Sequence, residues 1–279
     1  MTGLRTHRYL RLALVGIVVA LAASVLIELI RSGGQPLPSI SDYYYSPAGG
    51  VFVGALTAAG VALLVLSGRD TESMLLDIAA VFAPLIAIVP TGYRGEPSVP
   101  SEVLPTVRNG VGVYLTMVTI LVALGIVLAA RGDLAWRRVA IVGGTASAVV
   151  IALATLAFAP GPAAVFPFPG GINLHLVATV CFFAMFAAIP WVTSFGEDPP
   201  AAGYRRVYLA VSVVIAAALV TTVGAAIANP DTMGVLIGEA VALGAFAVYW
   251  TAQTIERWGD ADPPSILPAS YPRWDSNPD

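Results

Sequence analysis

Residues 207–227 read VYLAVSVVIAAALVTTVGAAI, a run of 21 residues with no charged side chain. A helix needs about 20 apolar residues to cross the hydrocarbon core of a bilayer, so this run predicts a transmembrane helix. Seven other stretches have a similar length and character. Together they predict an all-α polytopic membrane helix bundle with eight transmembrane spans, near residues 12–30, 50–67, 74–90, 110–130, 139–159, 172–194, 207–227 and 233–254.

The composition independently indicates a membrane protein. Hydrophobic residues make up 57% of the 279 residues and charged residues 11%, with a mean hydropathy of +0.82. Water-soluble domains carry about 25% charged residues, so we interpret residues 1–258 as the single transmembrane domain of a multi-pass cell-membrane protein. Residues 259–279 are rich in proline and aspartate, which predicts a disordered tail because proline cannot continue a helix.

The distribution of arginine predicts the orientation in the membrane. All 14 basic residues are arginine; eleven fall on the side of the two termini, and only Arg31, Arg94 and Arg108 fall on the other side. Positive residues are retained in the cytoplasm, so we expect both termini, including the tail, to be cytoplasmic. The connections that contain residues 31–49 and 91–109 then lie outside.

Ionisable side chains inside the spans are the first candidates for a function, because each costs about 2.5–3.5 kcal/mol at the centre of a membrane helix. Glu28, His175 and Glu239 lie toward the predicted outer leaflet, and Asp77 lies near the cytoplasmic end of its span. Glu239 is about 10 Å deep at 1.5 Å per residue, so it must be paired, protonated or facing a cavity. His175 fits either a hydrogen-bonded residue at a helix start or an imidazole that exchanges a proton or binds a ligand.

The first outer connection contains an unusual polar and aromatic segment, Ser41-Asp42-Tyr43-Tyr44-Tyr45. Tyrosines often form a belt at the headgroup level, and Ser41-Asp42 fits a turn or cap before the second span; a binding site is the alternative. We expect this segment and His175 to belong to one site on the outer face. The candidate ligand-binding residues are Glu28, Ser41, Asp42, Tyr43, Tyr44, His175 and Glu239.

Several classes of function are disfavoured by what the sequence lacks. Cys181 is the only cysteine and the chain has two histidines, which excludes a cysteine-based zinc site and a three-histidine site. Motifs for a serine nucleophile, a phosphate-binding loop or a dinucleotide are absent. The net charge of −3 argues against nucleic-acid binding. We therefore expect no metal or other cofactor, no nucleic-acid partner, and membrane lipids as partners. A mixed metal site of His175 with Glu239, Asp42 or Glu28 has no diagnostic spacing and stays an alternative.

Residues 39–45 (SISDYYY), followed by residues 51–54 (VFVG), carry a resemblance to known proteins, together with Pro90-Thr91, His175 and Phe182-Phe183. The chain resembles a group of uncharacterised polytopic bacterial membrane proteins with a Ser-x-Ser-x-Tyr-Tyr-Tyr segment before a Val-Phe-Val-Gly helix start. More distantly, the Pro-x-Ile-Ser pattern is similar to the first outer loop of DRAM-like and GPI-remodelling membrane proteins. This resemblance implies no established activity and points to the same outer face.

Three functions remain as alternatives. The first is a membrane protein that binds a lipid headgroup or another small amphiphile in a polar pocket of the outer leaflet. The second is a membrane-embedded hydrolase or transferase that uses His175 as a proton carrier with Asp42 or Glu239 as its partner. The third is a proton-coupled transporter in which Glu239 and Asp77 act as relay acids on opposite sides.

Overall fold

The computed structural model describes residues 2–68, 71–93, 96–196, 199–228 and 233–258, with side chains from residue 7 onward. This part of the chain is helical without strands, and eight of its spans are long and apolar enough to cross a membrane, which confirms the predicted all-α bundle. The predicted tail, residues 259–279, lies outside the described residues. The helices are α1 (Thr2–Arg31), α2 (Gly49–Leu66), α3 (Thr71–Ile88), α4 (Leu104–Ala130), α5 (Trp136–Arg138) continuing through a π-helical turn (Val139–Gly143) into α6 (Gly144–Phe158), α7 (Leu174–Ser194), α8 (Ala202–Ala228) and α9 (Gly234–Glu256).

Three helices begin well before their predicted starts: α1 at Thr2 instead of residue 12, α8 at Ala202 instead of residue 207, and α4 at Leu104 instead of residue 110. Pro105 lies in the first turn of α4, where a missing N–H removes no helical hydrogen bond. Residues 104–109, which include Pro105, therefore belong to α4 and not to the connection before it. The α5–α6 span likewise begins at Trp136, three residues before the predicted start.

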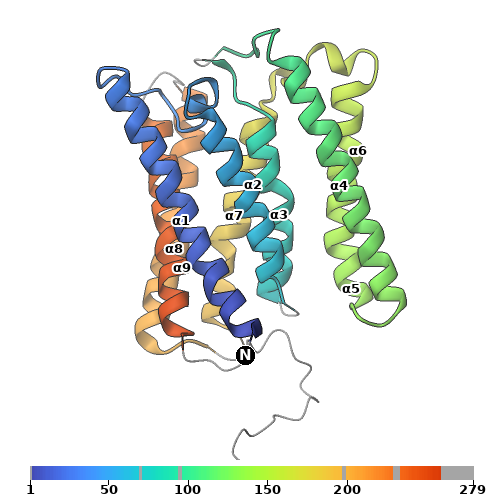
Figure 1. Ribbon diagram of the computed structural model, residues 1–279, viewed down its shortest axis with the longest axis vertical. Helices are drawn as coiled ribbons and strands as arrows, with labels where there is room; N and C mark the ends of the chain where they lie inside the picture. Colours follow the sequence, from blue (N-terminus) through green and yellow to red (C-terminus); the bar gives the residue numbers. More distant parts are fainter. Residues whose placement is uncertain (1, 69–70, 94–95, 197–198, 229–232, 259–279) are drawn as a thin grey trace, which may run out of the picture.

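Six of the helices form a closed ring (Figure 1). Neighbouring pairs around the ring are α1–α2, α2–α3, α3–α7, α7–α8, α8–α9 and α9–α1. The remaining helices, α4 and α5–α6, form a hairpin that packs against the outside of α3. The hairpin separates α3 from α7 in the sequence, although these two helices are neighbours in space.

Aromatic side chains of α7 and α9 fill the inside of the ring. The centroid of the Phe186 aromatic ring lies 4.4 Å from the aromatic centroid of Phe246, 5.6 Å from that of Tyr249 and 6.1 Å from that of Trp250. All four residues are buried. Offset and edge-on aromatic contacts of this kind stabilise a core beyond the area they bury, so the middle of the ring is packed.

Close packing of α8 against α9 depends on Gly238. A Cβ atom at this position would lie 2.1 Å from Thr222 Oγ1 and 3.1 Å from the carbonyl oxygen of Ala218. Small residues at helix contacts allow such approaches in membranes. Gly54 of α2 differs, because no atom lies within 4 Å of a Cβ built there.

Replacing Gly238 with alanine should force α9 away from α8. We expect Gly238→Ala to lower the free energy of unfolding by about 1–3 kcal/mol, measured by denaturation of the purified protein in detergent. Gly54→Ala is the matched control and should be neutral or slightly stabilising, because it adds a methyl group in open space. Equal effects of the two variants would show that Gly238 does not set the α8–α9 distance.

The two ends of the ring differ in their connections. α1 begins and α9 ends at one end, and α2, α4, α7 and α9 begin at the other (Figure 1). We call these the terminal end and the loop end. The arginine distribution predicts that the terminal end is cytoplasmic.

Labelling with a thiol reagent that cannot cross the membrane tests this orientation. In a Cys181→Ala background, cysteines at the exposed positions Gln35 and Ser101 of the loop end should react on intact cells. Cysteines at the exposed positions Asp133 and Ala201 of the terminal end should react only after permeabilisation. The reverse pattern would place the loop end in the cytoplasm.

Candidate functional site

The connection from α1 to α2 lies at the loop end, and its residues 37–48 fold into the helix bundle. We call this segment the tyrosine loop. Residues Ser41–Tyr45 form a short 3-10 helix, of which Ser41, Asp42 and Tyr43 are buried. Ser39 fixes its start, because Ser39 Oγ donates to Asp42 Oδ2 and accepts from the Asp42 N–H, each at 3.0 Å. The fold of the segment therefore places polar side chains inside the protein.

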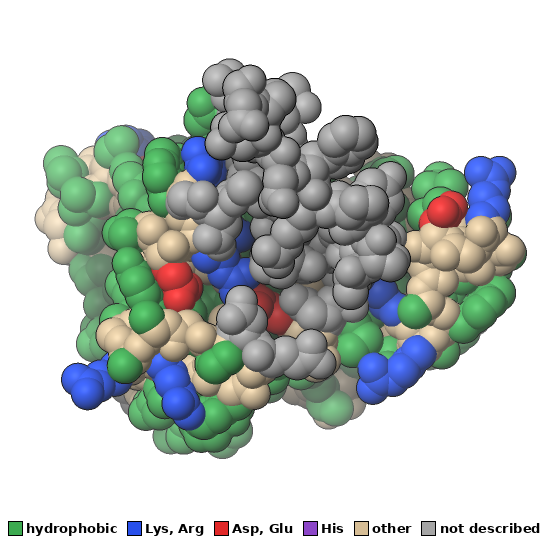
Figure 2. All heavy atoms as spheres, turned by 90° about the horizontal axis from the view of Figure 1, so that it is seen from below, with side chains coloured by type: hydrophobic (Ala, Val, Ile, Leu, Met, Phe, Trp, Pro, Cys, Tyr) green, Lys and Arg blue, Asp and Glu red, His purple; other side chains and the backbone are tan. Residues whose placement is uncertain are grey.

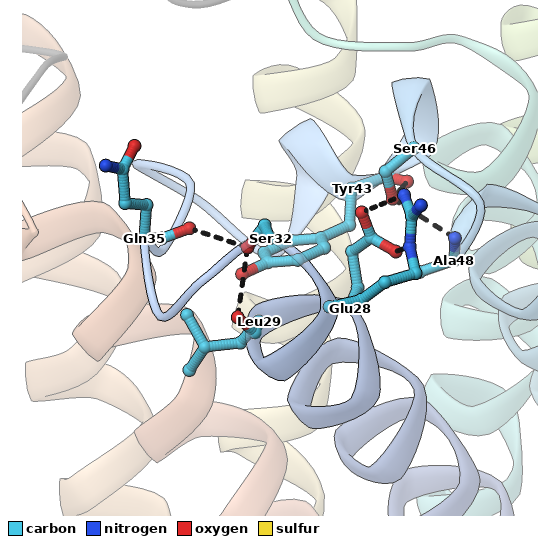
Figure 3. Close-up of polar contacts among 8 residues, drawn as sticks. Glu28, Leu29, Ser32, Gln35, Tyr43, Ser46 and Ala48 are labelled. Atoms are coloured by element: carbon cyan, nitrogen blue, oxygen red, sulfur yellow. Dashed lines mark hydrogen bonds and ion pairs between the residues drawn. The ribbon is translucent and has the colours of Figure 1, made fainter.

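The end of the tyrosine loop is held equally closely. Ser46 Oγ donates to the carbonyl oxygen of Tyr43 at 2.8 Å and accepts from the Ala48 N–H at 3.1 Å (Figure 3). A Cβ atom on Gly49 would lie 2.2 Å from the carbonyl oxygen of Tyr44. Glycine is thus needed at the first residue of α2 for the 3-10 helix to pack against it.

Glu239 of α9 anchors the tyrosine loop. Its Oε2 accepts the backbone N–H of Ile40 at 2.5 Å, and its Oε1 accepts the hydroxyl of Ser41 at 2.8 Å. The backbone adds a third link, since the Leu236 N–H donates to the carbonyl oxygen of Pro38 at 3.0 Å. That N–H belongs to the first turn of α9, where it has no partner within the helix.

His175 of α7 approaches Ser41 from the other side. His175 Nε2 lies 2.7 Å from Ser41 Oγ, and His175 Nδ1 lies 2.7 Å from the carbonyl oxygen of Val89. Ser41, His175 and Glu239 are 5%, 4% and 8% exposed. The structure therefore brings three of the predicted site residues, from three separate segments, into one buried network.

The number of hydrogen atoms in this network is constrained. The carbonyl of Val89 can only accept, so Nδ1 of His175 carries a hydrogen and Nε2 is the atom that faces Ser41. The Ser41 hydroxyl has one hydrogen for two neighbours. Both of its hydrogen bonds can form together only when one additional proton lies on His175 Nε2 or on Glu239.

The network has the same total charge whether the additional proton is on His175 or on Glu239. With the proton on His175, the imidazolium donates to Ser41, which donates to the Glu239 carboxylate. With the proton on Glu239, the carboxylic acid donates to Ser41, which donates to Nε2. Transfer of two hydrogens along the Ser41 hydroxyl interconverts these states without moving a heavy atom.

The position of His175 is set by the residues before α7. Asn173 caps the helix, its side-chain oxygen accepting the N–H groups of His175 and Leu176 at 3.0 and 3.3 Å. Gly170 and Gly171 precede it with φ angles of 60° and 80°, a region that glycine adopts at little cost. An asparagine directly before an apolar run is a helix-cap signal, and it is the feature of the sequence that marks this helix start.

Thr91 links α7 to the tyrosine loop. Asn173 Nδ2 donates to Thr91 Oγ1 at 3.1 Å, and the Tyr45 hydroxyl donates to the carbonyl oxygen of Thr91 at 2.6 Å. Burial, together with the nearby charges of Tyr44 and Asp42, raises the pKa of Tyr45 above its usual value. The Tyr45 hydroxyl therefore keeps its proton and remains a donor.

The other predicted site residues have separate environments. Glu28 lies at the end of α1, where both carboxylate oxygens bind Arg31 at 2.8 Å (Figure 3). The Tyr43 hydroxyl accepts the Leu37 N–H at 3.4 Å, and the half-buried Tyr44 packs edge-on against Tyr45 with ring centroids 5.1 Å apart. Burial raises the pKa of Tyr44. Asp42 lies beside the network through its bond to Ser39.

Asp77, the predicted relay acid at the other end, forms an ion pair with Arg138. Arg138 Nε donates to Asp77 Oδ2 at 2.9 Å, and the same guanidinium contacts Ser67 and the carbonyl oxygen of Gly68. These contacts join α5 to the turn between α2 and α3. Asp77 therefore has a structural role in holding the α4–α6 hairpin.

A shallow groove of about 500 Å³ lies away from the buried network, on the outer face of α4 and α6 near the loop end. Arg108 and Asn109 lie at one end of it, and Met117 and Phe158 supply apolar lining. Arg108 also donates to the carbonyl oxygen of Ala163 at 2.9 Å. The seven predicted site residues do not line this groove.

The contribution of Ser41 can be measured against a matched serine. Ser41→Ala leaves Glu239 and His175 without their shared partner, and we expect it to lower the free energy of unfolding by about 1–3 kcal/mol. Ser212 of α8 is also buried, but its hydroxyl has no hydrogen-bond partner among the described residues. Ser212→Ala should therefore be neutral or stabilising; similar losses in both variants would mean that the network adds no stability.

Comparison with protein-family models, curated proteins and solved structures finds no match to this chain. The resemblance of residues 39–45 and 51–54 to uncharacterised bacterial membrane proteins therefore stays a prediction, and the geometry of the network is the basis for a functional proposal.

Proposed function

We propose that this integral membrane protein responds to protons: the Ser41–His175–Glu239 network binds one proton, and that proton holds the tyrosine loop against α7 and α9. The observation that carries the proposal is a single hydroxyl placed 2.7 Å from an imidazole nitrogen and 2.8 Å from a carboxylate oxygen. A histidine and a carboxylate joined in this way can take up or release a proton in the range of about pH 5 to 8.

Loss of the proton weakens the attachment of the loop. Ser41 then donates either to Glu239 or to His175, and the other acceptor remains buried without a donor, which costs about 1–3 kcal/mol. The folded state with the loop attached thus binds the proton more strongly than the state with the loop released. Attachment is therefore favoured at low pH and weakens as the pH rises.

Few other charged groups act on the network. Among the described residues, Asp42 is the charged side chain that interacts electrostatically with Glu239, and the carbonyl oxygens of Val89 and Ile86 face His175. A fixed positive charge that would replace the proton is not among these groups. Proton uptake supplies the additional hydrogen that both hydrogen bonds of Ser41 require.

Two of the three functions expected from the sequence, the membrane-embedded hydrolase or transferase and the lipid-binding protein, have weaker support. The distance between Ser41 and His175 suits a serine nucleophile with a histidine base, but Ser41 is 5% exposed and donates to Glu239, so its hydroxyl is not presented to a substrate. A lipid headgroup at the predicted residues would have to displace hydrogen bonds that the network already makes.

Glu239→Gln tests the proposal because glutamine resembles the protonated acid. Its amide nitrogen can donate to Ser41 while its oxygen accepts the Ile40 N–H. We expect the wild-type tyrosine loop to exchange its amide hydrogens faster, after correction for intrinsic exchange, as the pH rises from about 5 to 8. In Glu239→Gln the loop should stay protected across this range, measured by hydrogen exchange with mass spectrometry.

Glu28→Gln is the matched control, because Glu28 is an acidic residue near the same end that pairs with Arg31. It should keep the wild-type pH dependence. Infrared difference spectra between the two pH values should also show the carbonyl band of a protonated carboxylic acid, or the bands of an imidazolium, that Glu239→Gln lacks. A wild-type loop with no pH dependence would contradict the proposal.

A further inference from the structure

A second polar cluster lies at the terminal end, between α1, α2, α3 and α9. It surrounds a cavity of about 20 Å³. Figure 2 views this end of the molecule and shows arginine and acidic side chains together on it. The polar side chains that line the cavity are His7, Arg11, Glu72, Ser73, Gln253 and Arg257.

Two buried donors in the lining lack a hydrogen-bond partner. Arg11 is 7% exposed and Trp250 is 1% exposed. No described residue accepts a hydrogen bond from Arg11 Nε or from Trp250 Nε1. Buried donors are almost always satisfied in folded proteins. Both side chains line the cavity, so an acceptor placed there would give them a partner.

The charges of the lining favour an anion as that acceptor. Arg11 and Arg257 carry two positive charges and are close enough to repel each other, whereas Glu72 carries one negative charge. Glu72 Oε1 accepts from the Tyr249 hydroxyl at 2.9 Å and from Gln253 Nε2 at 3.0 Å. The two ion pairs within the described part of the chain, Arg31–Glu28 and Arg138–Asp77, lie elsewhere. Glu256, which does not line the cavity, also acts electrostatically on Arg257, so the excess of one positive charge belongs to the lining itself.

We propose that this cavity binds the anionic oxygen of a phosphate group, held by Arg11, Arg257 and the Trp250 N–H. A cavity needs about 10–15 Å³ to hold one water, so 20 Å³ admits a terminal oxygen but not a whole phosphate. The rest of the group projects from the end of the bundle. Free phosphate and the phosphodiester of a phospholipid headgroup share this chemistry. The inference does not rest on the proton network.

The test uses full-length protein in detergent, in a buffer without phosphate and chloride. Inorganic phosphate, and separately short-chain phosphatidylglycerol with phosphatidylcholine as the zwitterionic comparison, are titrated while thermal stability is recorded. We expect at least one of the two anionic probes to stabilise the wild-type protein in a saturable manner. Saturation by phosphate indicates a free oxyanion as the ligand, and saturation by phosphatidylglycerol alone indicates a lipid headgroup.

Paired variants separate binding from folding. Arg11→Gln should weaken binding about tenfold or more, because hydrogen bonds to charged groups contribute about 1.5–3 kcal/mol. Arg8→Gln makes the same charge change one turn earlier in α1. Arg8 does not line the cavity, and its Cζ lies 5.0 Å from the centroid of the Trp258 ring. The Arg8→Gln variant should therefore bind like the wild type. Glu72→Gln removes the opposing charge and should tighten binding.

The test compares three variants, so its result does not depend on the folding of any one of them. Weaker binding in Arg11→Gln, or tighter binding in Glu72→Gln, with Arg8→Gln unchanged, supports a specific site. Equal weakening in Arg8→Gln and Arg11→Gln would show that only net charge matters, and would overturn it. Absence of saturable stabilisation by both anionic probes would also overturn it and leave water as the occupant.

Discussion

The carboxylate of Glu239 accepts hydrogen bonds from the Ile40 N–H and the Ser41 hydroxyl inside a helical bundle, and the organisation of the loop end depends on these two bonds. An isolated carboxylate in an apolar interior is very costly, so the chain has to supply donors at this depth. It does so by folding the tyrosine loop inward. His175, Val89 and Thr91 then have fixed positions, because each is joined to that loop directly or through one neighbour.

The helices were largely predictable from the sequence, and the reason is physical. Apolar runs of about 20 residues have few alternatives to crossing a membrane, so all eight spans are found where hydropathy predicts them. The start of α4 was predicted six residues too late, since Pro105 reads as a loop residue although a first helical turn accepts it.

The candidate site was predictable only in part. Depth along a span can be read from the sequence, and it singled out Glu239, which is buried. His175, expected either at a helix start or in a site, is buried as well. The direction in which a side chain leaves its helix depends on which helices are neighbours. Glu28 lies on the same predicted side, two residues before the end of its predicted span, and it pairs with Arg31 at the end of α1. In the sequence, Arg11 is one of several arginines near the N-terminus, and nothing there marks it as buried. Its burial beside Trp250 follows only from the packing of α1 on α9.

The ring of six helices has a consequence for how such a chain can change. The α4–α6 hairpin, residues 104–158, contributes no wall to the ring, and α3 would meet α7 without it. Thr91 and Asn173, which flank the hairpin in the sequence, already touch through a hydrogen bond of 3.1 Å. An even number of spans lies between them, so a chain that lost the hairpin would keep both termini on one side. The hairpin is thus an insertion between two sets of three helices, and the contacts that close the ring are made by those six helices alone.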